Sequence, residues 1–264
     1  MNTFDKSKID SSIAQYSLRV KKGDVGKYVL LPGDPDRVLR IAKYLENPRE
    51  VAYCREFRTV TGQYKGITVS ATSTGIGCPS ASIAVEELAN VGATHFIRIG
   101  STAALQPHLK TGDIVINTGT LRNDGTTRAY VPENFPAVPD FFLVQKLIES
   151  ATALQQTKNF KVHVGLNACD DAFYAETPEW IHNLSKYKLL NVEMESSAIF
   201  TVAYLRGLHA AMICAVSANL VNPVNVDYDR GEKGNEKLVE GWENEIAIAL
   251  DAIEKYEKNP PKIG

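Results

Sequence analysis

The sequence predicts an α/β fold, a single domain with a central mixed β-sheet flanked by helices. Two observations lead to this prediction. Short apolar runs typical of strands alternate with segments of helical spacing along the whole chain, and no low-complexity linker divides its 264 residues. A chain of this length can bury a sizeable core as one domain. We therefore expect one domain over residues 1–264, with loose tails at residues 1–14 and 257–264.

The expected strands and helices follow one another in a regular order. Strands are expected at residues 28–31, 51–54, 58–63, 67–73, 94–99, 113–117, 161–168 and 211–217. The runs 58–63 and 67–73 should form a hairpin, because a short turn containing glycine separates them. Helices are expected at about residues 35–45, 79–91, 138–154, 177–186, 193–205 and 236–256. Three of these begin at or next to a proline, whose missing amide is harmless at a helix start.

Composition narrows the kinds of partner and the compartment. The net charge of −2 argues against a nucleic-acid or membrane surface as the main partner. No apolar run approaches the roughly 18–20 residues that span a bilayer, and residues 1–12 lack the hydrophobic core of a secretory signal. The four cysteines are scattered without metal-like spacing, so we expect reduced thiols in a cytoplasmic protein. We assign none of the five histidines to a metal.

Three arginines, Arg37, Arg55 and Arg98, each come at the end of a strand-like run. A guanidinium is always charged and presents a planar fork that matches a pair of phosphate oxygens. Burying such a group is costly unless an anion meets it. Because each arginine also lies near glycines or a hydroxyl residue, the three together predict a pocket for a phosphate-sized anion.

The Gly-Asp-Pro-Asp-Arg run at residues 33–37 joins a strand to a helix. Glycine lets the backbone approach a ligand, and a helix N-terminus directs amides towards an anion. A plain tight turn with Asp34 as the N-cap is the competing interpretation, and the run by itself favours that interpretation.

A second glycine-containing run, at residues 74–80, loosely matches a dinucleotide-binding fingerprint. That fingerprint expects an acidic residue about 20 positions later, at the end of the next strand. Arg98 and Ser101 occupy that region instead, which disfavours an NAD-dependent enzyme.

Glu193 and Glu195 open an expected helix with apolar spacing behind them. Residues two apart on a helix diverge by roughly 200°, so the two carboxylates should not share one pocket. Either both complement the helix dipole, or one binds a diol through two hydroxyl hydrogen bonds. The Phe173-Tyr174 pair at a strand exit is typical of core packing and less often of ligand stacking.

With these motifs in order, the chain resembles the uridine phosphorylase and hexameric purine nucleoside phosphorylase family. The resemblance extends from about residue 15 to residue 219 and is closest in wording to the uridine branch. It is densest at residues 32–37, 55–57, 73–88, 96–100, 112–115, 135–138 and 192–196. It implies a nucleoside phosphorylase-like fold and a pentosyl transfer in which nucleoside and phosphate give free base and (deoxy)ribose 1-phosphate.

The resemblance also implies a role for individual residues. Arg98 and Glu195 would carry catalysis, and no cofactor would be needed besides inorganic phosphate as co-substrate. Phosphate would be held by Gly33, Arg37, Arg98 and Ser101, and by Arg55 across a dimer interface. Ribose would contact Ser101, Met194 and Glu195, and the base would lie near Phe173 and Asn219. Glu56 and Ser80 match positions that hold a potassium ion between subunits in some uridine phosphorylases. The implied assembly is a homodimer unit that builds a homohexamer.

Departures from the family pattern concentrate where the base would bind. Ser17 replaces a histidine that contacts the ribose 5′-hydroxyl from the neighbouring subunit. Ala218 replaces the aspartate that protonates the base in purine enzymes, Leu220 replaces an arginine of the uridine branch, and Ala103 replaces a glycine. The spacing from residue 175 to Glu193 is also closer to the purine enzymes. Neither base signature is complete. On its overall wording the sequence favours a pyrimidine nucleoside as substrate, with a purine or modified nucleoside as one alternative and binding with little turnover as another.

Overall fold

The computed structural model describes residues 9–222 and 236–261, and within them the chain forms one mixed sheet of nine strands. The rest of the expected tails, residues 1–8 and 262–264, lie outside the described residues. The strands are β1 (Tyr28–Leu31), β2 (Glu46–Cys54), β3 (Phe57–Tyr64), β4 (Ile67–Thr72), β5 (His95–Ala104), β6 (Ile114–Asn123), β7 (Val162–Asp170), β8 (Asn191–Glu193) and β9 (His209–Asn219). The α-helices are α1 (Pro35–Ala42), α2 (Cys78–Asn90), α3 (Phe141–Gln155), α4 (Pro178–Lys186), α5 (Ser196–Leu205) and α6 (Glu236–Lys258).

The strands lie in the order β2-β3-β4-β1-β5-β8-β7-β6-β9. Because β9 also pairs with β5, the strands β5, β8, β7, β6 and β9 close into a ring. Strand β5 is the junction: its first half pairs in parallel with β1, and its last two residues pair antiparallel with β8. The α/β class and the mixed sheet are thus as predicted, whereas the closure into a ring was not anticipated.

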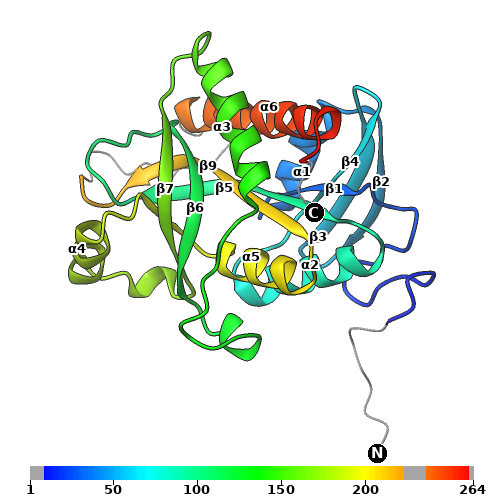
Figure 1. Ribbon diagram of the computed structural model, residues 1–264, viewed down its shortest axis with the longest axis horizontal. Coiled ribbons are helices and arrows are strands. Elements are labelled where there is room, and N and C mark those ends of the chain that lie inside the picture. The colour runs from blue at the N-terminus through cyan, green and yellow to red at the C-terminus, as the bar shows by residue number, and fades with distance from the viewer. Residues whose placement is uncertain (1–8, 223–235, 262–264) are drawn as a thin grey trace, which may run out of the picture.

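Helices cover the sheet on two sides (Figure 1), with α3 and α6 together on one side and α2 and α5 on the other. Each pair buries its own apolar core. The first core joins α1, α3 and α6 to the strands, and the second joins α2 and α5 to the opposite faces of those strands. Such burial from both faces explains why β1 and the start of β5 read as continuous apolar runs. Within the described residues, no helix is both long and apolar enough to cross a membrane.

Local signals placed several elements correctly. The β3–β4 hairpin turns at Lys65 and Gly66, which both have positive φ values of 49° and 80°, as a tight two-residue hairpin turn requires. Asp34 caps α1 by accepting a hydrogen bond from the Asp36 amide, so the N-cap interpretation of this run is confirmed. Thr177 caps α4 in the same way, with Pro178 as the first helical residue.

Other boundaries differ from prediction for identifiable reasons. Strand β5 continues to Ala104, beyond the apolar run that was expected to end at residue 99, because β8 and β9 keep pairing with it. Arg98 therefore lies inside a strand and not at its end, which corrects the prediction. Arg98 nevertheless pairs with Leu31, the last residue of β1, so it does lie at the carboxyl edge of that shorter neighbour.

Helix starts and ends also moved. Helix α5 begins at Ser196, three residues later than expected, since Glu193 belongs to strand β8. Helix α3 begins at Phe141 after an N-cap at Asp140, and α1 ends at Ala42 instead of residue 45. Helix α6 runs to Lys258, two residues into the segment expected to be a loose tail.

Candidate functional site

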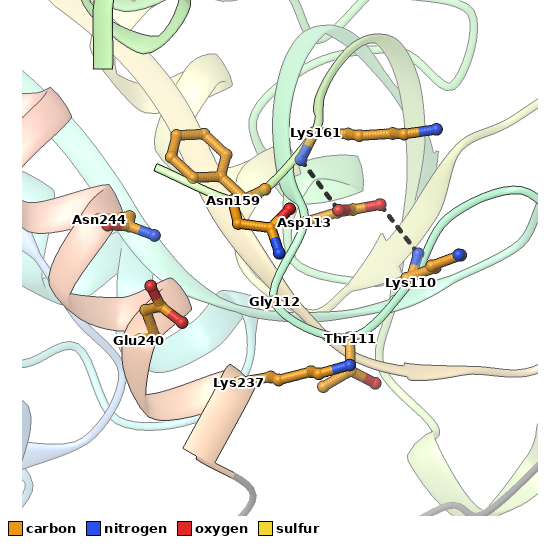
Figure 2. A pocket seen from close by; sticks show the side chains of 10 residues that line it. Lys110, Thr111, Gly112, Asp113, Asn159, Lys161, Lys237, Glu240 and Asn244 are labelled. Carbon is orange, nitrogen blue, oxygen red and sulfur yellow. Dashed lines mark hydrogen bonds between the residues drawn. The ribbon is translucent and has the colours of Figure 1, made fainter. Parts of the chain in front are cut away.

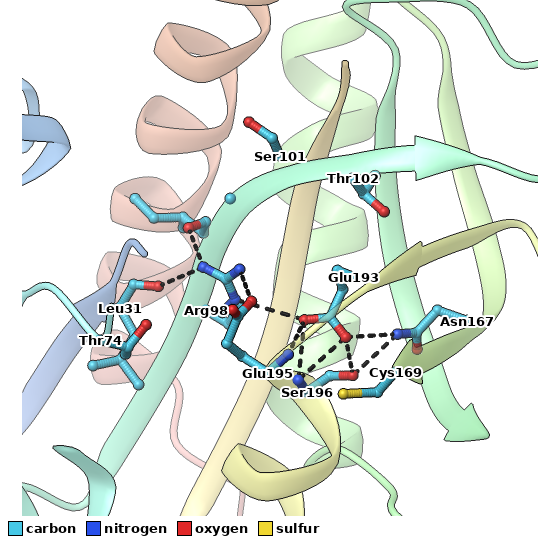
Figure 3. A network of polar contacts seen from close by, with 12 residues as sticks. Leu31, Thr74, Arg98, Ser101, Thr102, Asn167, Cys169, Glu193, Glu195 and Ser196 are labelled. Atoms are coloured by element: carbon cyan, nitrogen blue, oxygen red, sulfur yellow. Dashed lines mark hydrogen bonds and ion pairs between the residues drawn. The ribbon is translucent and has the colours of Figure 1, made fainter. Parts of the chain in front are cut away.

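Arg98 is the centre of a buried polar cluster (Figure 3). Its side chain is almost fully buried and forms an ion pair with Glu195, and its Nη1 donates to the carbonyl oxygens of Leu31 at 3.4 Å and Ile99 at 3.2 Å. The guanidinium folds back over Gly100, where a Cβ would lie 2.7 Å from Nη1. Glycine at position 100 is therefore required for this arginine conformation.

Both glutamates reach Arg98, which contradicts the expectation that they diverge. Glu193 Oε2 lies 3.7 Å from Arg98 Nε, while Glu195 contacts the other end of the guanidinium. The divergence argument assumed a helix, but Glu193 ends strand β8 and Glu195 precedes α5. Glu193 fits the first of the two expected roles, at the start of the helix. Glu193 accepts from the backbone amides of Glu195 at 2.9 Å and Ser196 at 3.0 Å, which satisfies the start of α5.

The charged groups of this cluster shift one another's pKa values. Burial alone lowers the pKa of Arg98, but Glu195 and further nearby acids outweigh burial and raise it. Burial and the charge of Glu195 raise the pKa of Glu193, against the opposing effect of Arg98. Arg98 is thus a permanent cation within β5, beside Leu31 at the end of β1.

Three other residues predicted to hold phosphate, Gly33, Arg37 and Ser101, lie close to Arg98 or to one another. A Cβ on Gly33 would lie 3.8 Å from Arg98 Nη1, which places this glycine beside the guanidinium. Arg37, in the first turn of α1, lies 3.5 Å through Nη1 from Ser101 Oγ on β5. Among the described residues, the buried Nε atoms of Arg37 and Arg98 have no hydrogen-bond partner. Arg98 Nε faces Glu193 Oε2 at 3.7 Å, beyond hydrogen-bond distance, so the unpaired Nε of Arg37 is the donor that a bound anion could satisfy.

Arg55 lies apart from this cluster. It is exposed in the tight turn between β2 and β3, with a φ of 56°. Its neighbour Glu56 accepts a hydrogen bond from Ser80 Oγ at 2.8 Å, so the two positions matched to a potassium site are adjacent. A carboxylate and a hydroxyl are oxygen donors of the kind that alkali cations bind. Gly75 allows this approach, since a Cβ there would lie 2.6 Å from Glu56 Cγ.

Three of the departures from the family pattern, Ala103, Ala218 and Leu220, lie near one another. Ala103 on β5 pairs directly with Ala218 on β9. Ala103 and Leu220 also pack against a small apolar cluster with Val192, next to helix α4. The region expected to meet the base is thus apolar where the family has an arginine or an acid.

Four further predicted contacts are placed as follows. Asn219 donates to the carbonyls of Gln106 and Leu109, both at 2.9 Å, and its side-chain oxygen accepts two backbone amides. All hydrogen-bonding groups of its side-chain amide are therefore paired within the chain.

The other three residues lie elsewhere. Phe173 is half exposed and packs edge-on against Tyr174. Met194 is partly buried and lies between the two glutamates in sequence. The backbone amide of Ser17 is tied to the Glu87 carboxylate at 2.9 Å.

Sequence reasoning missed two residues of helix α6. Trp242 Nε1 donates to Ser101 Oγ at 2.9 Å, and its ring lies under the Arg37 guanidinium at 5.1 Å. Glu245 is 1% exposed and accepts backbone amides from Gly100 and Ala215. The available signal was a carboxylate placed on the apolar stripe of a helix, with Gly241, Ile248 and Ala252 at helical spacing.

A separate cavity of about 250 Å³ lies where α6 begins (Figure 2). It is lined by Lys110, Thr111, Gly112, Asp113, Asn159, Phe160, Lys161, Lys237, Glu240 and Asn244. Asp113 accepts from the backbone amides of Lys110 and Lys161, both at 3.0 Å, and so holds the two turns together. None of the arginines discussed above lines this cavity, so it is distinct from the anion cluster.

The geometry brings together two arginines, a hydroxyl and glycines beside the buried carboxylate of Glu195, which makes this cluster a candidate anion site. This arrangement can hold a phosphate next to a polyhydroxylated group. Comparison with known proteins agrees, since the model of the phosphorylase superfamily matches residues 27–253. The chain belongs to this superfamily.

Alignments with individual relatives extend over most of the chain. It is 44% identical over 220 residues to a uridine phosphorylase from Thermococcus kodakarensis, covering 78% of each protein. It is 39% identical over 239 residues to a guanosine phosphorylase from Halorubrum lacusprofundi, covering 90% of this chain and 98% of that one. The crystal structure of uridine phosphorylase from Vibrio fischeri ES114 with 6-hydroxy-1-naphthoic acid superposes with a TM-score of 0.83 at 34% identity, covering 93% and 98% of the two chains.

Proposed function

We propose that this chain is a nucleoside phosphorylase that transfers a pentosyl group from a nucleoside to inorganic phosphate, with a preference for uridine or related pyrimidine nucleosides. The observation that carries the proposal is the convergence of Arg37, Arg98 and Ser101 beside the buried carboxylate of Glu195. The relatives that are uridine phosphorylases support the pyrimidine preference.

In this proposal the arginines position phosphate as the nucleophile. The bond between the sugar and the base weakens as the sugar develops positive charge, and the phosphate oxygen forms the new bond to the same sugar carbon. Phosphate and the Glu195 carboxylate place negative charge near that developing cation. Fixed donors also hold the phosphate in line, which lowers the entropic part of the barrier. The electron pair of the broken bond leaves with the base.

Glu195 is suited to the ribose hydroxyls because a carboxylate can accept two hydrogen bonds at once. In the structure it accepts the Gly77 amide at 2.7 Å and pairs with Arg98. Gly77 has a φ of 92°, so this amide reaches the carboxylate through a backbone conformation that favours glycine. Binding of ribose would therefore exchange one of these contacts for hydroxyl donors, with Met194 packing on the sugar.

The base is the less specified half of the substrate. The guanosine phosphorylase relative keeps a purine nucleoside as the second candidate. Because Ala103, Ala218 and Leu220 offer no charged group, base selection would rest on apolar contacts and on Phe173. We assign Asn219 a supporting role behind the base, since its amide is already satisfied by backbone groups.

The complete site would require a second subunit. Arg55 is exposed and outside the cluster, which suits a residue that completes the phosphate site of a partner. An exposed apolar groove of about 420 Å³, lined by Leu121, Val138, Leu166 and Tyr187 among others, supports self-association. We propose a homodimer unit within a homohexamer, with Glu56 and Ser80 near a potassium ion at the subunit boundary. The free cysteines suit a cytoplasmic enzyme.

The test is release of free base from a panel containing uridine, thymidine, guanosine and adenosine, with and without inorganic phosphate. We expect release that depends on phosphate and is fastest with uridine. Release without phosphate would indicate hydrolysis and overturn the proposal. Binding of nucleosides without release from any of them would indicate a protein of the binding class. A mixture of an Arg55→Ala subunit with a Glu195→Ala subunit should recover activity if Arg55 acts across the interface.

A further inference from the structure

Glu245 is a buried carboxylate directly behind the phosphate site. It lies in helix α6, one turn after Trp242, and its Oε2 accepts the amide of Gly100 at 3.2 Å and that of Ala215 at 3.1 Å. These amides belong to neighbouring strands, so the carboxyl group sits against both β5 and β9. The helix can approach this closely because of Gly241, where a Cβ would lie 2.9 Å from Ala215 Cβ.

The charges around Glu245 do not balance when every acid is ionised. Arg37 of α1 and Arg98 of β5 are the cations that face it, and the Cys214 thiol of β9 lies nearby. Further titratable groups close to these arginines are Asp34, Glu193 and Glu195. Two arginines against the buried carboxylates Glu193, Glu195 and Glu245 give 2 − 3 = −1. A phosphate would add one or two more negative charges to this volume, which is costly in a buried site.

A proton on one of the three carboxyl groups would relieve this excess, and their contacts distinguish them. Glu195 forms a direct ion pair with Arg98, and Glu193 accepts from Asn167 and from backbone amides at the start of α5. Glu245 accepts two neutral backbone amides, and none of its hydrogen bonds in the described part of the chain comes from an arginine. Burial raises the pKa of Glu245 to about 8, with Arg37 and Arg98 opposing that shift.

We propose that Glu245 is a positioning residue for the phosphate site that couples phosphate binding to the uptake of one proton. Solvent supplies the proton, the Glu245 carboxylate receives it, and no covalent bond in the protein or the phosphate changes. The neutral acid then leaves Arg37 and Arg98 free to direct their charge towards the phosphate. This inference rests on the proposed function, because it requires phosphate to occupy the cluster.

The coupling has a defined pH dependence. Below about pH 7 Glu245 already carries its proton, so phosphate binding takes up none through this group. From about pH 8 upwards the free protein loses that proton, and bound phosphate restores it. Because binding takes up one proton in this range, the dissociation constant for phosphate should rise by up to about tenfold for each pH unit above pH 8. At pH 9 inorganic phosphate is the dianion, so its own ionisation adds nothing to the proton count at that pH.

Isothermal calorimetry with inorganic phosphate alone tests this inference. Titrations at pH 7 and pH 9, each in two buffers with different ionisation enthalpies, measure the protons taken up. We expect close to one proton for the wild type at pH 9 and close to none for Glu245→Gln, which keeps an oxygen for both amides. The variant should also lose less phosphate affinity between the two pH values. Glu240→Gln, a change at an exposed position of the same helix, should behave as the wild type.

Infrared difference spectra give a second readout that does not depend on the variant folding. Addition of phosphate to the wild type at pH 9 should produce a carbonyl band of a protonated carboxyl group, and this band should be missing in Glu245→Gln. Phosphate binding without proton uptake and without this band would overturn the inference but leave the proposed function intact. Uptake of the same number of protons by Glu245→Gln would also overturn it. Absence of phosphate binding at every pH would refute both the inference and the proposed phosphorolysis.

Discussion

The proposed phosphate end and the proposed base end of the candidate site are built by different kinds of contact. At the phosphate end, charged groups from α1, β5 and α6 meet through specific polar geometry around Arg98. At the base end, alanines and Leu220 pack against an apolar cluster. Directional charge interactions tolerate little displacement, whereas apolar contacts adapt to a change in size. We therefore expect substitutions at the phosphate end to cost far more activity than substitutions at the base end.

Arg98→Ala should give the largest effect. It removes the central cation and leaves Glu193 and Glu195 without their ion-pair partner, so we expect kcat/KM to fall by about 10³-fold or more. Initial rates of phosphorolysis at varied phosphate concentration measure this loss, and thermal melting reports whether the fold survives. Arg128→Ala is the matched control, since that arginine forms a solvent-exposed pair with Glu133. Wild-type activity in Arg98→Ala would refute the anion site.

Gly100→Ala should have the next largest effect. The added Cβ would lie 2.7 Å from Arg98 Nη1, so the guanidinium must move away from its present position. Loss of well-placed donors of this kind costs about 10²-fold, and we expect most of the change in the KM for phosphate. Gly125→Ala provides the comparison, because its Cβ would meet no closer atom than Asp171 Oδ2 at 3.7 Å. Equal effects of the two substitutions would show that the position of Arg98 is not critical.

Leu220→Ala tests the base end. Shortening this side chain removes apolar contact with the cluster around Val192, so we expect the ratio of kcat/KM for uridine and guanosine to change by about tenfold. The KM for phosphate should stay near the wild-type value, because no charged contact is touched. Both quantities come from the same initial-rate series. A large change in phosphate KM with an unchanged base ratio would reverse the division of the site described above.

The smallest effect on activity is expected at the opposite end of β5, where His95 stacks on His209 at 4.5 Å. Burial, and then the charge of His209, lower the pKa of His95 from 6.5 to about 4. Between these values the unfolded chain binds a proton that the folded chain does not. Folding stability should therefore be fully present above about pH 6.5 and fall by up to about 3 kcal/mol as the pH drops to about 4.

Denaturant unfolding at pH 7.5 and pH 5 measures this loss, with His95→Phe as the comparison. The phenylalanine variant should lose less stability between the two pH values and keep wild-type activity at pH 7.5. A variant with the same pH dependence as the wild type would show that His95 is not responsible. A large loss of activity at pH 7.5 would show that the two ends of β5 are not independent.

Much of the fold followed from local chemistry. Contacts within a few residues determine several turns and helix starts. Examples are the Lys65-Gly66 turn, the caps at Asp34 and Thr177, and the prolines that begin helices α1 and α4. Strand lengths were underestimated because pairing with a neighbour continues through polar residues, as in the Arg122–Cys169 pair of β6 and β7. Such pairing depends on residues distant in sequence, so no local pattern reports it.

The candidate site divides in the same way. The Gly33–Arg37 turn, Arg98, Ser101 and Glu195 stand in recognisable motifs. In the structure, Gly33 lies beside Arg98, and Arg37 lies beside Ser101. The directions of the Glu193 and Glu195 side chains were misjudged, because Glu193 ends strand β8 and Glu195 lies in a bend before α5, so both side chains reach Arg98. A helix boundary displaced by three residues was enough to reverse that conclusion.

By itself, the sequence determined the α/β class, the superfamily and the residue types that an anion site requires, because each of these is written in short segments. Only the tertiary structure decided that Trp242 and Glu245, far along the chain, lie beside Ser101 and Gly100 at the proposed phosphate end, and that Ala103 and Ala218 pair across β5 and β9. The physical reason is that buried charges are balanced in space and not along the chain. Closure of β9 onto β5 and the close approach of α6 at Gly241 bring those charges together.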